Sequence, residues 1–260
     1  MITKHAILRQ ISLWMRSILF IELSLVLALF FAFFFLLGVP PLFDLDEGAF
    51  SSATWEMLQR QDFITVYSNG ELRFDKPILI YWLQSLSVSW LGLNEFALRL
   101  PSALAASLWV FALFYFVRGS VTLAWPANQT ISVNINQPNV IALLSAFLLM
   151  NAFMVVIIGR AATADAVLNL LIALSLFDIY RYFALQSSGT HIPSTTLSTV
   201  KSKQTRLIYR VYLWLGLGLL CKGPIAIFVP FTASLLFALW DQQWRLWWRA
   251  IFHPLGWLLM

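Results

Sequence analysis

Four short stretches of this sequence place charged side chains beside long apolar runs. They read DLDEGAFSS, FDKPILIYW, GRAATADAVL and LGLGLLCKGP, and the first follows directly on FFAFFFLLGVPPLF. Carboxylates can accept protons or steady developing positive charge, whereas lysines bind anions. Charges at a membrane edge are costly without a partner, which makes them candidates for function. The charges singled out on this ground are Asp44, Asp46, Glu47, Asp75, Lys76, Arg160, Asp165 and Lys222.

The composition shows which kind of protein has to position these groups. The chain has 260 residues, of which 60% are hydrophobic and 11% are charged, and its mean hydropathy is +0.78. A soluble domain has about 25% charged residues, so this composition is that of an integral membrane protein. The net charge of +5 is modest, and we expect no nucleic-acid partner. The single cysteine, Cys221, excludes an intrachain disulfide.

Apolar runs predict an all-α, multi-spanning membrane domain that covers residues 1–260. The spans are expected near 18–38, 101–118, 139–158, 166–184, 208–221 and 223–240, with the start of a seventh near 250. The pair on either side of Lys222 is short for two spans. One long helix, bent at Gly223 and Pro224, is the alternative.

The apolar segment 76–92 is predicted to lie on the membrane surface. Its apolar part has about 15 residues, whereas a span needs about 20, and Pro77 and Gly92 frame a short helix. With this segment on the surface, eleven basic and two acidic residues share one side, and six basic and nine acidic residues share the other. The positive-inside rule then places the N-terminus in the cytoplasm and the loop 39–100 outside.

Each charged stretch also has an interpretation that involves no chemistry. Capping of an amphipathic surface helix explains one or two of the three clustered carboxylates, and we assign Asp44 to this role. Lys76 and Lys222 could be lysines that extend toward water from the membrane edge. Arg160 and Asp165 could form a local ion pair across a short turn.

The chemical interpretation joins the four stretches on the outer face. The lysines would hold an anionic lipid headgroup, and a carboxylate would take a proton from an acceptor. Phosphate is then the natural leaving group, which describes sugar transfer from a polyprenyl phosphate. A transporter or flippase for an anionic lipid is the alternative, and it predicts broken helices near the middle of the membrane. A non-catalytic scaffold would have no cavity joining these residues.

The four stretches resemble the lipid-carrier-dependent glycosyltransferases. These are the GT-C membrane enzymes that include the lipid A aminoarabinose transferase and the protein O-mannosyltransferases. The matching segments DEGAFSSATWEML, FDKPILIYWLQ, GRAATADAVLNLLIALSLF and LGLGLLCKGPIAIFVP occur in family order within residues 18–240, with QDF where relatives often have GDW. The resemblance implies a multi-spanning domain with two surface helices in the first outer loop. It also implies an inverting transfer from a polyprenyl-phosphate sugar to a lipid or protein acceptor, as in lipid A modification or protein glycosylation.

The resemblance also implies roles for individual residues. Asp46 would be the catalytic carboxylate, with Glu47 assisting. The donor phosphate would be bound by Lys76 and Lys222, and the same cavity would be lined by Arg160 and Asp165. Asp75 stands where relatives can have a Glu associated with a divalent metal, so a metal is possible and Asp75 is its candidate ligand, although no cofactor is expected to be required.

The resemblance also sets the expected location and extent of the protein. The site would lie on the periplasmic face of a bacterial inner membrane. Family members are usually much longer, so we expect residues 1–260 to be an N-terminal part. An inactive truncated remnant is the alternative.

Overall fold

The computed structural model describes residues 19–124, 137–187, 194–253 and 256. A first helix covers Leu19–Phe34 and ends in a π-helix, η1 (Phe30–Phe34). The elements that follow are α2 (Asp44–Arg60), β1 (Tyr67–Ser68), β2 (Glu71–Leu72), α3 (Leu79–Leu91), α4 (Glu95–Ala124), α5 (Gln137–Met150), α6 (Phe153–Arg160), α7 (Asp165–Ser187), α8 (Ser194–Lys222), α9 (Ile225–Trp240) and α10 (Trp244–Ile251).

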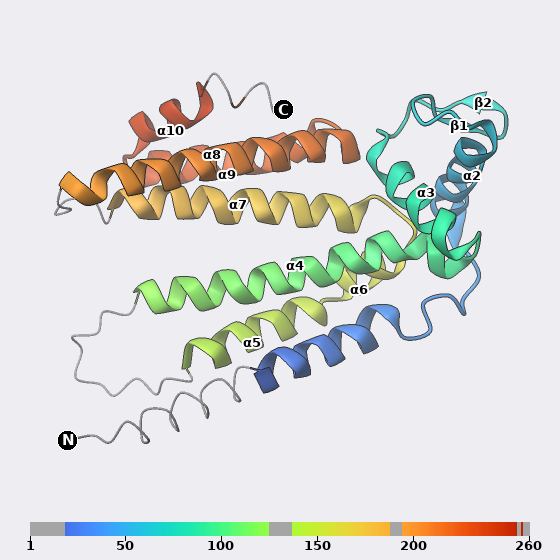
Figure 1. Cartoon of the computed structure of the whole chain (residues 1–260), viewed down its shortest axis with the longest axis horizontal. Helices are drawn as coiled ribbons and strands as arrows, with labels where there is room; N and C mark the ends of the chain where they lie inside the picture. Colours follow the sequence, from blue (N-terminus) through green and yellow to red (C-terminus); the bar gives the residue numbers. More distant parts are fainter. Residues whose placement is uncertain (1–18, 125–136, 188–193, 254–255, 257–260) are drawn as a thin grey trace.

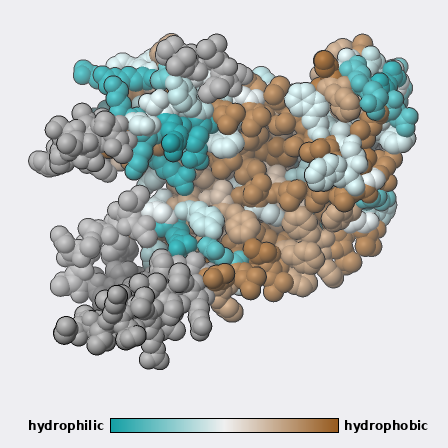
Figure 2. Space-filling view, viewed as in Figure 1, coloured by the Kyte–Doolittle hydropathy of each residue, from teal (hydrophilic) through white to brown (hydrophobic). Residues whose placement is uncertain are grey.

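The long helices run lengthwise in a bundle, and the first outer loop covers one of its ends. Figure 1 shows α2, α3 and the hairpin β1–β2 gathered at this end, while the chain crosses to the other end along α4 and α7. On the face shown in Figure 2, a broad hydrophobic band covers the middle, with hydrophilic residues toward both ends. Many large apolar side chains of the described helices are exposed, among them Phe20, Leu148 and Phe153. This arrangement agrees with the expected all-α membrane class.

By length and composition, few of the described helices qualify as complete spans. Glu95–Val121 and Asp165–Leu185 pass this test alone, and Pro138–Met150 with Phe153–Arg160 would form a third span across a bend of 66°. The helices Leu19–Phe34 and Ile225–Trp240 are apolar but shorter. The arrangement of six spans and the start of a seventh therefore stays a prediction.

The structure corrects several element boundaries. The spans expected at 101–118 and 208–221 are parts of the longer helices α4 and α8. The span expected at 139–158 is broken between α5 and α6. Close to the expected start of a seventh span, the structure has the eight-residue helix α10, which packs on α9 through Trp247, and residues 254–255 and 257–260 lie outside the described part. The hairpin β1–β2 was not predicted. Its turn is the pair Asn69 and Gly70, which is typical of tight hairpins, and both residues adopt the positive φ that such a turn requires.

The helices α8 and α9 form an antiparallel hairpin, so the single bent helix is excluded. A Cβ atom on Gly218 would lie only 2.6 Å from the Cβ atom of Ala226, because the chain turns back at Gly223 with a φ of +73°. At the far end of the hairpin, Ala238 packs in one cluster with Leu207. The tight turn leaves Lys222 at the end of the bundle that carries the outer loop (Figure 1).

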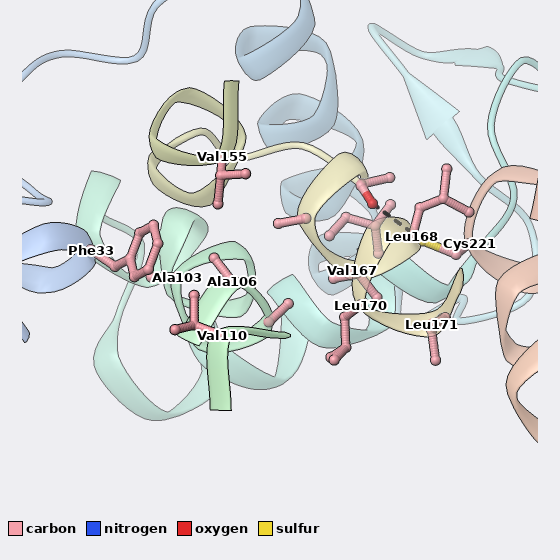
Figure 3. Close-up of a cluster of buried hydrophobic side chains, with 14 of the residues drawn as sticks. Phe33, Ala103, Ala106, Val110, Val155, Val167, Leu168, Leu170, Leu171 and Cys221 are labelled. Carbon is pink, nitrogen blue, oxygen red and sulfur yellow. Dashed lines mark hydrogen bonds between the residues drawn. The ribbon is translucent and has the colours of Figure 1, made fainter. Parts of the chain in front are cut away.

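Small residues allow η1, α4 and α6 to pack closely in the core. Figure 3 shows the Phe33 ring directed toward Ala103 and Ala106 of α4, beside Val155 of α6. A Cβ atom on Gly159 would lie 2.8 Å from both the Ala106 Cβ atom and the Phe33 ring. Interiors packed at this density do not accept an added methyl group without movement of the helices.

We predict that Gly159→Ala destabilises the bundle by about 1–3 kcal/mol, the usual cost of overpacking. Gly119→Ala is the matched control, because it also lies in a helix but has open space around its Cβ position. Thermal unfolding in detergent, followed by size-exclusion chromatography, measures the difference. Equal melting temperatures for the two variants would contradict the packing described.

Candidate active site

A buried ion pair joins the first outer loop to the bundle. Glu47 in the first turn of α2 is 5% exposed, and Arg99 in the first turns of α4 is 4% exposed. Arg99 Nε donates to Glu47 Oε1 at 2.9 Å, and Arg99 Nη2 donates to Glu47 Oε2 at 2.8 Å. Two parallel hydrogen bonds of this kind fix the orientation of both groups, which a single contact does not.

The remaining donors of Arg99 go to the chain that connects the first helix to α2. Its Nη1 atom donates to the carbonyl groups of Leu37 at 3.0 Å and Pro40 at 2.7 Å. Its Nη2 atom also donates to the carbonyl of Pro41 at 2.9 Å. All five N–H groups of the guanidinium can therefore be engaged, and all five acceptors belong to segments that precede or begin α2.

The carboxylate of Glu47 is saturated as well. The backbone amides of Phe43 and Ala162 each donate to it at 2.6 Å. Burial acts to raise the pKa of Glu47, but the hydrogen bonds from Arg99 and from these two amides outweigh it and hold the pKa below its usual 4.5. A lowered pKa stabilises the folded state above pH 4.5, and this contribution is lost as the pH falls through the lowered value. Glu47 is therefore charged at neutral pH, with no lone pair left for a substrate proton.

Asp46, the residue before it, faces open space. Its side chain is exposed and has no hydrogen bond or ion pair with any described residue. It lines a cavity of about 350 Å³ at the outer end of the bundle, together with Arg160, Thr163 and Asp165. Adjacent helical residues point about 100° apart. The carboxylate of Glu47, which also lines this cavity, is therefore buried against Arg99, while that of Asp46 is exposed.

A second ion pair adjoins this cavity through Asp165, which lines it, whereas Lys222 and Lys76 are not lining residues. Lys222, at the end of α8, binds Asp165, at the start of α7, and both side chains are about one third exposed. Arg160 instead donates to the carbonyls of Ala32 at 3.0 Å and Phe35 at 2.9 Å, at the end of the first helix. Among the described residues, Arg160 and Asp165 therefore do not form the local ion pair that was considered for them.

The turn before α3 holds the other predicted residues. Asp75 accepts two hydrogen bonds from Arg73, at 2.7 and 3.0 Å. Burial acts to raise the pKa of Asp75, but the hydrogen bonds and the charge of Arg73 outweigh it, so the pKa is lowered. Lys76 is partly buried, and its ammonium has no hydrogen bond or ion pair with a described residue. This turn leads into α3, which contacts α8 near the Lys222 end (Figure 1).

The described residues do not fit a metal site at Asp75. No three His, Cys, Asp or Glu side chains gather anywhere in the part of the chain that the structure describes. Asp75 is already paired with Arg73, and one carboxylate alone does not hold a divalent ion. The proton transfer and phosphate binding proposed for this chain do not depend on a metal.

Sequence analysis missed three residues that shape this region. Arg99 was counted only as an outer basic residue, although a charge inside the apolar run FALRLPSAL signals a buried partner. Gln84, buried in α3, accepts from Thr54 and donates to the carbonyls of Leu98 and Ala162, so it fastens α2, α3 and α4 together. Tyr81 belongs to the segment predicted to lie on the membrane surface, but it is fully buried, and burial raises its pKa to about 12.

A family model matches almost the whole chain. The model is that of the dolichyl-phosphate-mannose-protein mannosyltransferases, and the match covers residues 22–253. The chain belongs to this family. The match includes every residue assigned above to the site, from Asp46 in the first outer loop to Lys222 at the end of α8.

Curated relatives in the family are transferases of the aminoarabinose class. The chain is 28% identical over 219 residues to the undecaprenyl phosphate-alpha-4-amino-4-deoxy-L-arabinose arabinosyl transferase of Aeromonas hydrophila, which covers 84% of the chain and 35% of that relative. It is 29% identical over 234 residues to the enzyme of the same name from Yersinia enterocolitica, covering 89% of the chain and 37% of the relative. The chain thus spans about a third of the length of these relatives.

Solved structures show the same fold. The crystal structure of ArnT from Cupriavidus metallidurans in the apo state superposes with a TM-score of 0.71 at 20% identity, over 95% of this chain and 40% of that one. The crystal structure of the same protein bound to undecaprenyl phosphate also gives a TM-score of 0.71, at 19% identity over 94% and 39% of the two chains. The all-α GT-C membrane fold expected from the sequence is therefore confirmed.

We predict that Arg99→Leu loosens the outer loop, because it leaves Glu47 charged and buried without its partner, at a cost of about 3–5 kcal/mol. Arg99→Lys should restore little, since one ammonium group cannot serve five acceptors in the geometry of a planar fork. Limited proteolysis of the loop 39–94 in membranes measures the change. Arg60→Leu is the control, because Arg60 is an exposed arginine of the same loop. Its ion pair with Glu56 and its contact with the Tyr67 ring are each worth about 1 kcal/mol or less at an exposed site. Wild-type resistance in both Arg99 variants would contradict the proposed role of the pair.

Proposed function

We propose that this chain carries the catalytic region of a membrane glycosyltransferase that moves a sugar from a polyprenyl-phosphate donor to a lipid acceptor. One observation supports this most directly: the unpaired carboxylate of Asp46 lines the same cavity as Asp165, which holds Lys222. The family membership and the names of the relatives point to the same chemistry. Because the chain matches about a third of the relatives' length, the activity of the whole protein is itself part of this proposal.

In this proposal Asp46 is the general base. It takes the proton from the acceptor hydroxyl as that oxygen attacks the anomeric carbon of the donor sugar. The bond from this carbon to the phosphate oxygen breaks, and the electron pair leaves with the polyprenyl phosphate. A single displacement inverts the anomeric configuration. Glu47 does not take a proton, because its carboxylate is fully hydrogen-bonded, and its part is to hold the start of α2 in place.

Lys76 and Lys222 would stabilise the leaving phosphate. Each supplies an ammonium group at the outer end of the bundle, and both approach from turns that border the region where α3 meets α8. Negative charge grows on the phosphate as the sugar leaves, so these contacts strengthen in the transition state. Arg160 contributes differently, since its guanidinium fixes the end of the first helix that forms the cavity rim.

Two alternatives are less well supported. A scaffold predicts no cavity at these residues, yet Asp46, Arg160 and Asp165 share one. A flippase predicts broken helices that carry substrate groups near the middle of the membrane. The structure does have a break at Asn151 and Ala152, but the side chain of Asn151 donates to the carbonyl of its own helix, and the charged groups lie at the outer end.

The proposed location follows from the charge pattern. The end of the bundle with α2, α3 and the cavity would face the periplasm of a bacterial inner membrane, and the opposite end would face the cytoplasm. A lipid acceptor such as lipid A fits the relatives' class, and a protein acceptor has no support among them.

We predict that Asp46→Asn in the full-length protein lowers sugar transfer by about 10²–10⁴-fold, the usual contribution of a general base. Glu71→Gln is the control, because Glu71 is an exposed acid of the same loop outside the cavity. Mass spectrometry of envelope lipids and proteins from cells carrying each variant measures transfer and shows which acceptor is modified. Wild-type transfer by Asp46→Asn would reject the enzyme assignment and favour a transporter.

We also predict that Lys76→Ala and Lys222→Ala each weaken binding of a polyprenyl phosphate by about 10-fold, since hydrogen bonds to charged groups contribute about 1.5–3 kcal/mol. Binding of the full-length protein to a fluorescent polyprenyl phosphate in detergent measures the change. Asp165→Asn removes the ion-pair partner of Lys222 but leaves the lysine in place. This variant should therefore not weaken phosphate binding. Unchanged affinity in both lysine variants would rule out the phosphate clamp.

A further inference from the structure

A second polar cavity lies at the opposite end of the bundle from the candidate active site. It has a volume of about 630 Å³ and is lined by residues of α4, α7, α8 and α9 and of the turn after α9. This volume falls within the roughly 300–1,000 Å³ of small-ligand pockets. Figure 2 shows hydrophilic residues at this end, beyond the hydrophobic band. Its polar and aromatic lining residues include Phe116, Tyr180, Arg181, Lys203, Arg206 and Asp241.

The cations of this cavity outnumber its acids. Arg181 is paired with Asp178 at 3.1 Å. Lys203 and Arg206, both exposed on α8, have no ion pair with any residue that the structure describes. Asp241 is the one acid of the lining, and it already accepts a hydrogen bond from Gln243.

The sequence explains why these two cations lack partners. Residues 179–240 contain no Asp or Glu, and neither do residues 1–18, 125–136 or 188–193. Besides Asp241, the acids toward this end are Glu22, held by Tyr115 and Arg118, and Asp178, which also binds Arg210 and Trp214. Within residues 1–260, Asp241 is therefore the one acid toward this end that has no basic partner among the described residues, and Lys203 and Arg206 are available to an anion.

One wall of the cavity is rigid and aromatic. The Phe116 ring stacks on Phe177 with centroids 4.2 Å apart, and it meets Tyr180 edge-on at 5.3 Å. The guanidinium of Arg181 lies 5.6 Å from the centre of the same Phe116 ring, while Asp178 holds its other side. A cation fixed in this way loses little side-chain freedom when an anion binds.

Aromatic residues also place the cavity at the level of lipid headgroups. Trp240, at the end of α9, is 90% exposed, and Trp244 in the next turn is 54% exposed. Tryptophan of this kind gathers at the interface between membrane and water. Apolar side chains of Leu185, Leu207 and Phe237 complete the lining toward the hydrophobic band, which suits the start of an acyl chain.

We propose that this cavity binds the phosphate of an anionic phospholipid from the leaflet on the basic, cytoplasmic side of the membrane. Lys203 and Arg206 supply the free cations, and Arg181 supplies a fixed donor on the aromatic wall. Basic pockets between helices on this side of a membrane are suited to anionic headgroups. The site is distinct from the donor site, because it lies at the other end of α4 and α7 and shares no residue with the outer cavity.

The test is native mass spectrometry of the full-length protein with added phosphatidylglycerol or, as the neutral comparison, phosphatidylcholine. We expect selective retention of phosphatidylglycerol by the wild type. Combined Lys203→Ala and Arg206→Ala should weaken it by roughly 10- to 30-fold, from the contribution of each basic residue near a membrane surface. Lys201→Ala is the matched control, because Lys201 is an exposed lysine of the same helix outside the cavity.

Further measurements distinguish a bound lipid from free phosphate and show which results would reject the lipid site. The conservative variant Lys203→Arg should keep lipid binding, and excess inorganic phosphate should not displace the lipid. Complete displacement by phosphate, equal retention by the double variant, or an equal loss in Lys201→Ala would each overturn the lipid site. Asp46→Asn should retain this lipid, so the lipid site and the proposed transferase activity can fail independently.

Discussion

The ion pair between Glu47 and Arg99 is the contact on which the outer end of the molecule depends. It lies where the end of the first helix, the start of α2, the start of α4 and the turn before α7 converge. A buried pair of this kind adds little net stability compared with apolar packing, because both charges lose their water. Its effect is to allow one arrangement of these four segments, since any other leaves a charge or a carbonyl unpaired. The orientation of Asp46 follows from that arrangement.

The rest of the outer end is fastened by single side chains that reach across hairpin ends. Gln84 links three helices through its amide, and the thiol of Cys221 donates to the carbonyl of Ala164 at 3.4 Å, shown as a dashed line in Figure 3. Arg160 satisfies carbonyls where the π-helix ends the first helix. Helix ends expose carbonyls and amides that have no partner within the helix. Polar side chains beside them are therefore used mainly to complete backbone hydrogen bonds, and few charges remain free for a ligand.

Sequence reasoning identified the membrane class, the two helices of the first outer loop and, among the residues that line the outer cavity, Asp46, Glu47, Arg160 and Asp165, because each leaves a local signal. The length of the apolar runs and the uneven distribution of basic residues indicated the class. The order of four motifs indicated the family, which the match over residues 22–253 confirms. The division of labour between Asp46 and Glu47 had no such signal, since the two side chains are chemically alike and adjacent. Their roles depend on Arg99, 52 residues away. The pairing of Lys222 with Asp165 across 57 residues likewise depends on the bundle, so the individual site roles remain predictions.

The Lys222–Asp165 pair has a consequence for how an empty site behaves. In the structure the ammonium of Lys222 is neutralised by Asp165, so it does not attract anions from solution as an isolated lysine would. Small anions, which offer one weak contact each, gain little by separating the pair. In the proposed function a membrane-anchored phosphate would differ, because its lipid chain would keep it near the pair at high local concentration and its binding would offset the loss of the pair. The ion pair would thus act as a filter that favours tethered ligands over freely diffusing ones.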